Sequence, residues 1–420
     1  MPSSHPNKTK SALGHREFVA LMAMTMALQA LAIDAMLPAL GHIAHDLNVA
    51  DPNRRQLVVG VFLVAAGFGS LIPGSLADRY GRRKVLLVSL ALYVLLSAAC
   101  ALAPDFDTLL AARAAQALGS AGLSVLPGAI IRDRESGDGM AKLMSTISVV
   151  FMMVPMVAPT LGQAVLLVAG WRWIFGLLAL MGTLLATWIA LRLPETLRPE
   201  YRQPILPMTI IGNMASAATN RDALGYVIGG ALTFGALFGY VNSSQQLVGE
   251  HFGAGAWFPL IFGGTALCMA LASFSNSRIV ERFGARRVSH TALIAYIAVS
   301  LVQVLLASRD HEALWQFMPV MMLNMCLVGF IGANFGSISL QPFARTAGAA
   351  SSVQAFLRMV IGAGLGIVIG QAFNGTALPL ARAFLACGIV SLLLVLYSER
   401  GKLFRRLNPP GTPRPVMEIH

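Results

Sequence analysis

Charged residues are scarce in this sequence of 420 residues. Only 12% of the residues are charged, whereas 56% are hydrophobic and the mean hydropathy is +0.68. Soluble domains carry charge on about a quarter of their residues, so this composition excludes an ordinary soluble domain and predicts a membrane protein. The formal net charge of +12 does not predict nucleic-acid binding. The cations lie in short segments between apolar runs, which is typical of the loops that orient a membrane protein.

Cysteine is scarce as well, and motifs of catalysis are missing. Each of the four cysteines stands alone inside an apolar run, so we interpret them as small core residues and predict no metal site. The sequence contains no Walker loop and no nucleophile–base pair, so we expect neither an enzyme nor ATP-driven pumping, and no cofactor. The first apolar run is too long for the hydrophobic region of a cleavable signal peptide.

Twelve apolar runs are long enough to cross about 30 Å of hydrocarbon. Because the bilayer offers no water to exposed backbone groups, each run is predicted to be a helix. The predicted fold class is therefore an all-α membrane protein with twelve transmembrane helices. The runs cover residues 18–40, 56–77, 85–103, 108–131, 143–169, 173–193, 223–246, 257–277, 288–307, 315–340, 348–373 and 377–397.

A short charged segment occurs twice. GSLADRYGRRK (Gly74–Lys84) follows the second run, and NSRIVERFGARR (Asn276–Arg287) follows the eighth. The pairs that lie 203 residues apart are Asp78 with Glu281, Arg79 with Arg282, Gly81 with Gly284, and Arg83 with Arg286. This match favours a duplicated protein over chance, with substrate bound between two six-helix bundles.

The predicted division of the chain follows from this repeat. It consists of a tail at 1–17, a first bundle at 18–193, a linker at 194–222, a second bundle at 223–397 and a tail at 398–420. Four prolines argue against a continuous helix in the linker.

The distribution of lysine and arginine predicts the orientation of the chain. With both termini in the cytoplasm, most of these cations lie on the cytoplasmic side, as expected for a membrane protein. The cations left on the opposite side are Arg54, Arg55, Arg172, Arg309 and Arg382.

Three ionisable residues lie well inside the predicted spans: Asp34, Arg113 and Arg358. Charge at this depth is costly and usually faces a cavity or a partner. Asp34 and Arg113 are each about 9 Å below the outer surface, so they can interact. One interpretation is a structural ion pair. The other is a carboxylate that binds and releases a proton, with Arg113 tuning it.

Other polar residues and prolines give weaker signals. Arg358 is near mid-depth, where it is a candidate either for binding anionic substrate groups or for structural pairing. Pro155 and Pro159 share one helical face that can bend or pack closely against a neighbour. Polar residues of the seventh and tenth runs either line a cavity or join helices. Those taken as candidates for substrate binding, besides Arg358, are Asn242, Gln245 and Asn334.

Several of these motifs resemble the major facilitator superfamily. GSLADRYGRRK is similar to its loop signature G-x-x-x-D-R-x-G-R-[RK], and RAAQALGSAG, which begins at Arg113, is similar to R-x-x-Q-G-x-G. APTLGQ, which contains Pro159 and Gly162, resembles the antiporter signature G-P-x-x-G-G. IDAMLPAL, IIRDRE and GWRWIF together resemble the bicyclomycin-resistance (Bcr/CflA) branch of drug:proton antiporters.

The resemblance implies efflux driven by inward proton flow, with Asp34 as the proton-linked acid and Arg113 as its partner. It also implies that Asp78 and the surrounding arginines form a cytoplasmic lock between the two bundles. The residues assigned to conformational gating are Gly74, Asp78, Arg79, Gly81, Arg82, Arg83, Glu281, Arg282, Pro155, Pro159 and Gly162.

We therefore expect a proton-coupled multidrug efflux transporter of the bacterial inner membrane that exports small amphipathic compounds by alternating access. Its expected partners are small-molecule substrate, protons and the lipid bilayer, without nucleic acid, and it is expected to act as a monomer. One alternative is a proton-coupled exporter of a metabolite such as a sugar or nucleoside. An alternative of another class is a non-transporting receptor or scaffold, which would show no substrate-dependent proton movement.

Overall fold

The computed structural model describes residues 13–134, 137–197, 200, 219–309, 312–343 and 347–405. Within these ranges the regular elements are all helices, as predicted. Most of the predicted linker and most of both predicted tails fall outside the described residues, so those predictions stay untested.

The helices form two groups that follow each other along the chain. The N-terminal half contains α1 (His15–Asp34), α2 (Leu40–Asp46), α3 (Leu57–Gly69), α4 (Pro73–Tyr80), α5 (Arg82–Ala101), α6 (Phe106–Ser120), α7 (Gly122–Arg134), α8 (Gly137–Val168) and α9 (Arg172–Arg192). The C-terminal half contains α11 (Arg221–Gln245), α12 (Phe258–Phe283), α13 (Ala285–Ala307), α14 (Leu314–Leu340), α15 (Ala347–Gln371) and α16 (Leu378–Ser398). Short 3₁₀ or π segments are η1 (Leu37–Ala39), η2 (Arg54–Gln56), η4 (Gln246–His251), η5 (Gly255–Trp257) and η6 (Gln341–Phe343).

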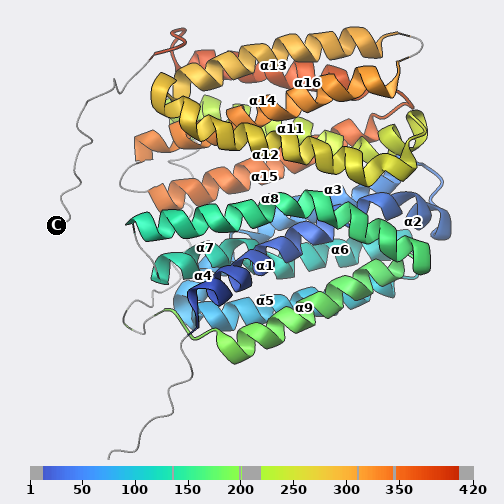
Figure 1. Cartoon of the computed structure of the whole chain (residues 1–420), viewed down its shortest axis with the longest axis vertical. Coiled ribbons are helices and arrows are strands. Elements are labelled where there is room, and N and C mark those ends of the chain that lie inside the picture. The colour runs from blue at the N-terminus through green and yellow to red at the C-terminus, as the bar shows by residue number, and fades with distance from the viewer. Residues whose placement is uncertain are drawn as a thin grey trace, which may run out of the picture.

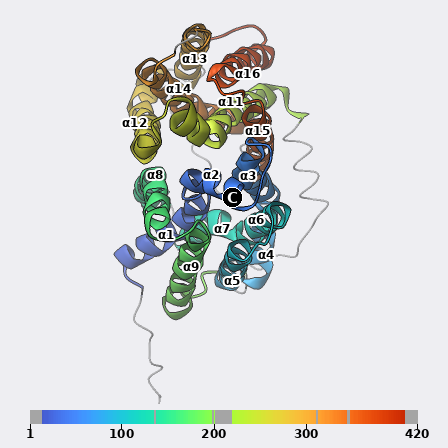
Figure 2. The same ribbon diagram turned by 90° about the vertical axis from the view of Figure 1, so that its right-hand side faces the viewer.

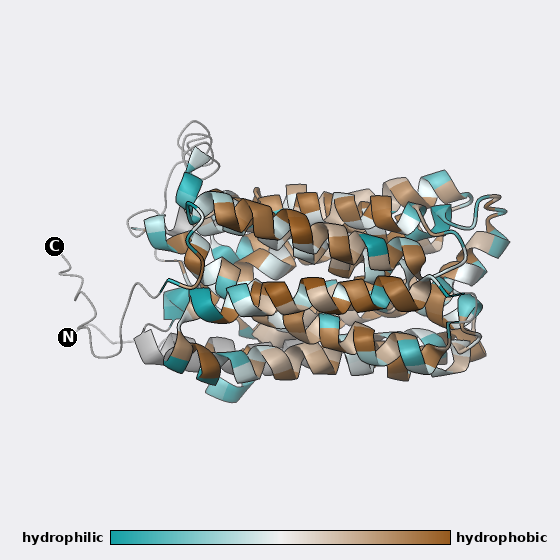
Figure 3. Ribbon diagram, turned by 90° about the horizontal axis from the view of Figure 1, so that it is seen from above, coloured by the Kyte–Doolittle hydropathy of each residue, from teal (hydrophilic) through white to brown (hydrophobic). Residues whose placement is uncertain are grey.

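The two halves stack side by side with their helices roughly parallel (Figure 1). They meet where α3 packs against α15 and α8 packs against α12, and the end-on view shows the same two junctions (Figure 2). We call the end where α1 begins and α16 ends the terminal end. The opposite end, which carries η2 and η4, is the far end. Hydrophobic residues fill the middle of the helices and hydrophilic residues gather toward both ends (Figure 3), as a bilayer requires.

The helices account for the predicted membrane spans. Each of the twelve predicted runs matches one helix or a series of consecutive helical segments, to within two residues at its ends. Among the described residues, ten spans are long and apolar enough to cross a membrane, and eleven if α3 and α4, bent by 43°, count as one. The remaining run corresponds to α8, whose apolar helical part, Met153–Val168, is shorter than the others. Pro73 explains the bend before α4, because it has no N–H to donate to the carbonyl of Gly69 and its ring would clash with that carbonyl in a continuous helix.

A glycine turn occupies the same place in both halves, which supports the predicted duplication. Gly81 separates α4 from α5, and Gly284 separates α12 from α13. Gly81 has φ 102° and ψ 145°, and Gly284 has φ 85° and ψ 146°. Residues with a Cβ rarely adopt this conformation, so the sharp turn at the terminal end depends on glycine in each half.

We expect the substitution Gly81→Ala to destabilise the protein by about 1–3 kcal/mol, because alanine must adopt a strained backbone there. Its Cβ would also overlap the carboxylate of Glu195. Thermal unfolding of the detergent-purified protein measures the effect. The matched control is Gly74→Ala in the preceding helix α4, where a Cβ would meet nothing within 4 Å. Equal melting temperatures for the two variants would contradict the role of Gly81.

Candidate functional site

The first predicted span is broken at Asp34. α1 ends there and η1 and α2 follow, although the sequence predicted one continuous run at 18–40. Pro38 explains the break, because it has no N–H to donate to the carbonyl of Asp34 and its ring would clash with that carbonyl. The last carbonyl groups of α1 therefore need partners from outside the helix.

Arg113 of α6 provides one such partner. Its side chain is fully buried, and one terminal nitrogen donates to the carbonyl oxygen of Ala32 at 3.1 Å. Its Nε donates to the carbonyl oxygen of Val58 at 3.0 Å, and its other terminal nitrogen donates to Oε1 of Gln116 at 2.8 Å. The ring of Phe62 lies 4.2 Å from the guanidinium. One cation thus joins α1, α3 and α6, and it lies at the C-terminal end of α1, where the helix dipole favours positive charge.

The carboxylate of Asp34 does not pair with Arg113. The Asp34 side chain is only 8% exposed, and it makes no hydrogen bond or ion pair with any described residue. The interpretation as a structural ion pair is therefore wrong for this conformation, because carbonyl and amide oxygens already occupy the guanidinium. A buried carboxylate without a partner is costly when it is charged.

α8 approaches the same break from the other side. A Cβ at Gly162 would overlap the carbonyl oxygen of Ala35 and crowd the ring of Pro38, so only glycine allows this close packing. α8 continues as one helix through Pro155 and Pro159. The structure thus brings Asp34, Arg113 and Gly162 together at the break, while the gating roles assigned to the two prolines stay predictions.

A polar cluster joins the two halves at the far end. We call it the far-end cluster, and it consists of Asn53, Arg55, Gln56, Gln246, Glu250 and Gln371. Arg55 pairs with Glu250 at 2.6 Å, and Gln56 donates to Gln246. Asn53 donates to the carbonyl oxygen of Gln371 at 3.1 Å, and Gln371 returns a bond to the carbonyl oxygen of Asn53 at 2.7 Å.

Every hydrogen bond and ion pair between described residues of the two halves belongs to this cluster or to its neighbours Pro52 and Phe373. The sequence pattern marked Arg55 only as one of the five cations away from the cytoplasmic side. The signal that could have identified the cluster is the segment Asp51–Gln56, which is polar except for Pro52 and directly precedes an apolar span. Among the described residues, polar bonding between the halves is therefore confined to the far end.

Asn242 and Gln245 lie beside the far-end cluster, at the end of α11. Asn242 is 1% exposed, and neither polar atom of its amide has a described hydrogen-bond partner. A Cβ on Gly60 of α3 would lie 3.7 Å from its amide nitrogen, so it faces the other half. Oε1 of Gln245 is also buried without a described partner. Unpaired buried amides are costly, so these atoms are available to a polar ligand.

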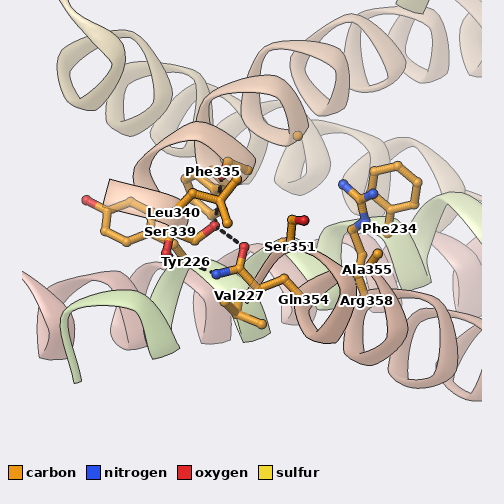
Figure 4. Close-up of a pocket in the computed structure, with 13 residues that line it drawn as sticks. Tyr226, Val227, Phe234, Phe335, Ser339, Leu340, Ser351, Gln354, Ala355 and Arg358 are labelled. Carbon is orange, nitrogen blue, oxygen red and sulfur yellow. Dashed lines mark hydrogen bonds between the residues drawn. The ribbon is translucent and has the colours of Figure 1, made fainter. Parts of the chain in front are cut away.

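Arg358 borders a cavity of about 180 Å³ in the C-terminal half. The cavity lies between α11, α14 and α15, and Figure 4 shows the guanidinium against the ring of Phe234, 4.8 Å from its centroid. Gln354 and Ser339 form a hydrogen-bonded pair elsewhere in the wall. Arg358 pairs with no described acid. The cavity therefore offers one uncompensated cation next to an aromatic face.

Asn334 does not line this cavity. Its amide nitrogen donates to Oδ1 of Asn276 at 2.8 Å and to the carbonyl oxygen of Phe330 at 2.8 Å. The side chain thus joins α14 to α12, so the prediction that Asn334 binds substrate is not supported. A buried amide that is already bonded between two helices serves packing.

The charged turns of the terminal end bond within their own halves. Arg82 forms ion pairs with Asp78 at 2.6 Å and with Asp133 at 3.2 Å, and its backbone N–H donates to Glu195 at 2.8 Å. In the C-terminal half, Arg286 pairs with Glu399 at 2.6 Å. In this conformation the described residues therefore form no lock between the halves through Asp78, contrary to what the resemblance implied. Each turn is tied to the end of the last helix of its own half.

The other residues assigned to gating at this end make local contacts. The guanidinium of Arg79 lies over the ring of Tyr80, and that of Arg282 lies over the ring of Phe283. Arg83 donates to a backbone carbonyl of α9. The side chain of Glu281 lies outside the described part of the structure.

Two repeated helical halves, a broken first span with buried charges and, among the described residues, polar bonds between the halves at one end are features typical of a membrane transporter. The sequence profile of the Major Facilitator Superfamily matches residues 22–367. The chain belongs to this superfamily, and it is therefore a transporter and not an enzyme.

Three proteins of similar sequence support this assignment to the superfamily. The chain is 33% identical to "Uncharacterized MFS-type transporter YdgK" of Bacillus subtilis over 89% of its own length and 93% of that protein. It is 29% identical to "Bicyclomycin resistance protein homolog" of Haemophilus influenzae, covering 90% and 94%. It is also 29% identical to "Multidrug resistance protein MdtL" of Klebsiella pneumoniae, covering 87% and 91%. The resemblance to the bicyclomycin-resistance branch is confirmed by these relatives.

The fold agrees with that of solved transporters. A bacterial homologue of the human lysosomal transporter Spinster, solved in an inward-facing and unoccupied conformation, superposes with a TM-score of 0.67 at 15% identity. The match covers 92% of this chain and 95% of that one.

We expect the substitution Arg55→Glu to weaken closure of the far end by about 1–3 kcal/mol, because it places two carboxylates where an ion pair stands. Spin labels on cysteines introduced at Asp51 and Asn374, in a variant without the native cysteines, report the distance between the halves by pulsed electron paramagnetic resonance. The single substitution should lengthen this distance in part of the population, and the charge swap Arg55→Glu with Glu250→Arg should restore it.

The matched control for this experiment is Arg54→Glu, because Arg54 pairs with Asp107 inside the N-terminal half at 2.9 Å. In Arg54→Glu, the distance between the two spin labels should equal that in the unsubstituted protein. A charge swap that fails to shorten the distance would show that the pair does not hold the far end closed.

Proposed function

We propose that this protein is a proton-coupled multidrug efflux transporter that exports small amphipathic compounds by alternating access. The observation that carries the proposal is the carboxylate of Asp34, which is buried at a break in the first span without a described partner. Such a group binds a proton when it is shielded from water and releases it when water or a cation reaches it. The names of the two resistance relatives support drugs as the exported class.

The geometry suggests how proton binding is linked to movement. Arg113 holds the carbonyl of Ala32, two residues before Asp34, and Gly162 packs against the carbonyl of Ala35. A charge that forms or disappears at Asp34 therefore acts on a point where α1, α6 and α8 meet. Because the break has fewer helical hydrogen bonds than a continuous helix, it is the part of the span that adjusts most easily. Protonation would favour one arrangement of this junction, and deprotonation the other.

Sidedness follows from the positive residues. We propose that the terminal end is cytoplasmic, in the inner membrane of a bacterium, and that the protein works as a monomer. The far-end cluster then closes the outer side, so the described conformation faces inward. In the outward-facing conformation this cluster would separate and protons would reach Asp34 from outside. The proton gradient then drives export without a bound cofactor.

Drug-driven proton movement tests the role of Asp34. We expect Asp34→Asn to abolish it, because an amide cannot exchange a proton, while the variant still inserts and folds. A pH-sensitive dye inside proteoliposomes reports the flux, and gel filtration checks the fold. The matched control is Asp107→Asn, an exposed acid at the far end. Drug-dependent proton flux of normal size in Asp34→Asn would rule out Asp34 as the coupling acid.

Arg358 provides a test of substrate selectivity. We expect Arg358→Gln to weaken export of anionic amphipathic compounds by about tenfold, because the cavity loses the uncompensated cation next to Phe234. Export of neutral compounds should change much less. Transport of matched anionic and neutral dyes measures the difference, with Arg382→Gln, an exposed arginine of α16, as the control. Equal losses for both dyes would reject binding of substrate charge by Arg358.

A further inference from the structure

An apolar groove lies in the C-terminal half, away from the junction of the two halves. It has a volume of about 480 Å³, and α12 and α13, which both pack on α14, form its walls. Ile279 and Phe283 of α12 are exposed on one wall, Ala295 of α13 lies on the other, and Leu327 and Phe330 of α14 also line it. Exposed apolar side chains at this depth face the hydrocarbon of the bilayer.

Cations stand at the mouth of this groove. Arg287 belongs to the first turn of α13, at the terminal end, and lines the groove itself. Arg282 lies next to Phe283, with its guanidinium over that ring. Both arginines are exposed, and neither forms an ion pair with a described carboxylate. Thr291, one turn after Arg287, adds an exposed hydroxyl. The mouth is therefore positively charged and lies at the depth of lipid headgroups.

The segment after α16 completes the mouth. Phe404 lines the groove, and its backbone carbonyl accepts a hydrogen bond from Nε of Arg287 at 3.1 Å. Its backbone N–H donates to Nδ1 of His290 at 3.0 Å, and its ring packs edge-on against the same histidine. Phe404 has φ 63°, a conformation that a phenylalanine keeps only when its surroundings hold it. The segment is thus firmly docked on α13.

This docking orients Arg287 for a ligand. Because Nε of Arg287 is bonded to Phe404, the plane of the guanidinium is set, and its two terminal nitrogens bond no described residue. A planar pair of N–H donors matches the oxygens of a phosphate. Behind the docked segment, Nε2–H of His290 bonds the oxygen of Tyr226, and the Tyr226 hydroxyl donates to Glu399. Glu399 is already paired with Arg286, so this acid does not neutralise Arg287.

We propose that this groove is a binding site for an anionic phospholipid of the leaflet at the terminal end. One acyl chain lies in the groove between α12 and α13, and the phosphate lies against the terminal nitrogens of Arg287. An acyl chain gains only packing when it leaves other chains for an apolar groove, so the chain by itself gives little selectivity. The charge at the mouth selects anionic over zwitterionic headgroups. This site is separate from the cavity at Arg358 and does not depend on the proposed function.

Binding of defined lipids to the full-length, detergent-purified protein tests the proposal. Phosphatidylglycerol and phosphatidylcholine with the same acyl chains are compared by native mass spectrometry and by the thermal stabilisation that each provides. We expect phosphatidylglycerol to bind more tightly, and Arg287→Gln to weaken its binding about fivefold, which is the effect of one surface cation on an anionic lipid. Arg287→Lys should keep most of the preference, and Ala295→Trp, which fills the groove, should reduce binding of the acyl chain.

The matched control is Arg309→Gln, an exposed cation just after the other end of α13. It should leave binding of phosphatidylglycerol unchanged. Equal binding of the two lipids, or an unchanged affinity in Arg287→Gln, would overturn the proposal. Displacement of the lipid by millimolar inorganic phosphate would overturn it as well, because it would show a site for a free anion. If Arg287→Gln does not fold, the proposal is tested by two other results. These are the comparison of the two lipids in the unsubstituted protein and the loss of lipid binding in Ala295→Trp.

Discussion

The bond between the buried guanidinium of Arg113 and the end of α1 is the interaction on which the N-terminal half depends. Pro38 ends the helical hydrogen bonding of α1, so the last carbonyl groups are left in a region without water. Arg113 satisfies one of them and at the same time binds the carbonyl of Val58 and the amide of Gln116. Three helices are therefore fixed to one another through one side chain. The position of Asp34 next to this junction follows from that arrangement.

Polar bonding is distributed unequally between the two ends of the molecule. At the terminal end, the described ion pairs of Arg82 bind the first glycine turn to α4 and α7, and the ion pair of Arg286 binds the second glycine turn to Glu399 after α16. Such bonds stabilise each half separately. At the far end, by contrast, the bonds of Asn53, Arg55 and Gln56 cross between the halves. Two halves that are stabilised separately and share polar contacts at one end are compatible with the alternating access proposed above.

Much of the candidate site could be predicted from the sequence, because charge inside a span is rare and therefore informative. Asp34, Arg113 and Arg358 were identified in this way, and Gly162 was identified by its motif. Their partners could not be predicted. Depth along a helix allowed Asp34 to reach Arg113. In the structure, however, the Arg113 guanidinium donates to the backbone carbonyls of Val58 and Ala32 and not to the carboxylate of Asp34. Asn334 likewise had the right depth to line a cavity, but its amide nitrogen donates a hydrogen bond to Asn276 of α12 instead.

The sequence by itself determined that this chain crosses a membrane as helices, and it indicated a duplication through a charged segment that occurs twice with a glycine at the same place. These features depend on composition, on the length of apolar runs and on local backbone geometry, all of which are properties of short segments. Only the tertiary structure decided which polar groups are paired, which end is closed and where an apolar groove meets an unpaired arginine. Those features depend on the packing of helices that are far apart in the chain, because a hydrogen bond or ion pair forms only when distance and direction are both right.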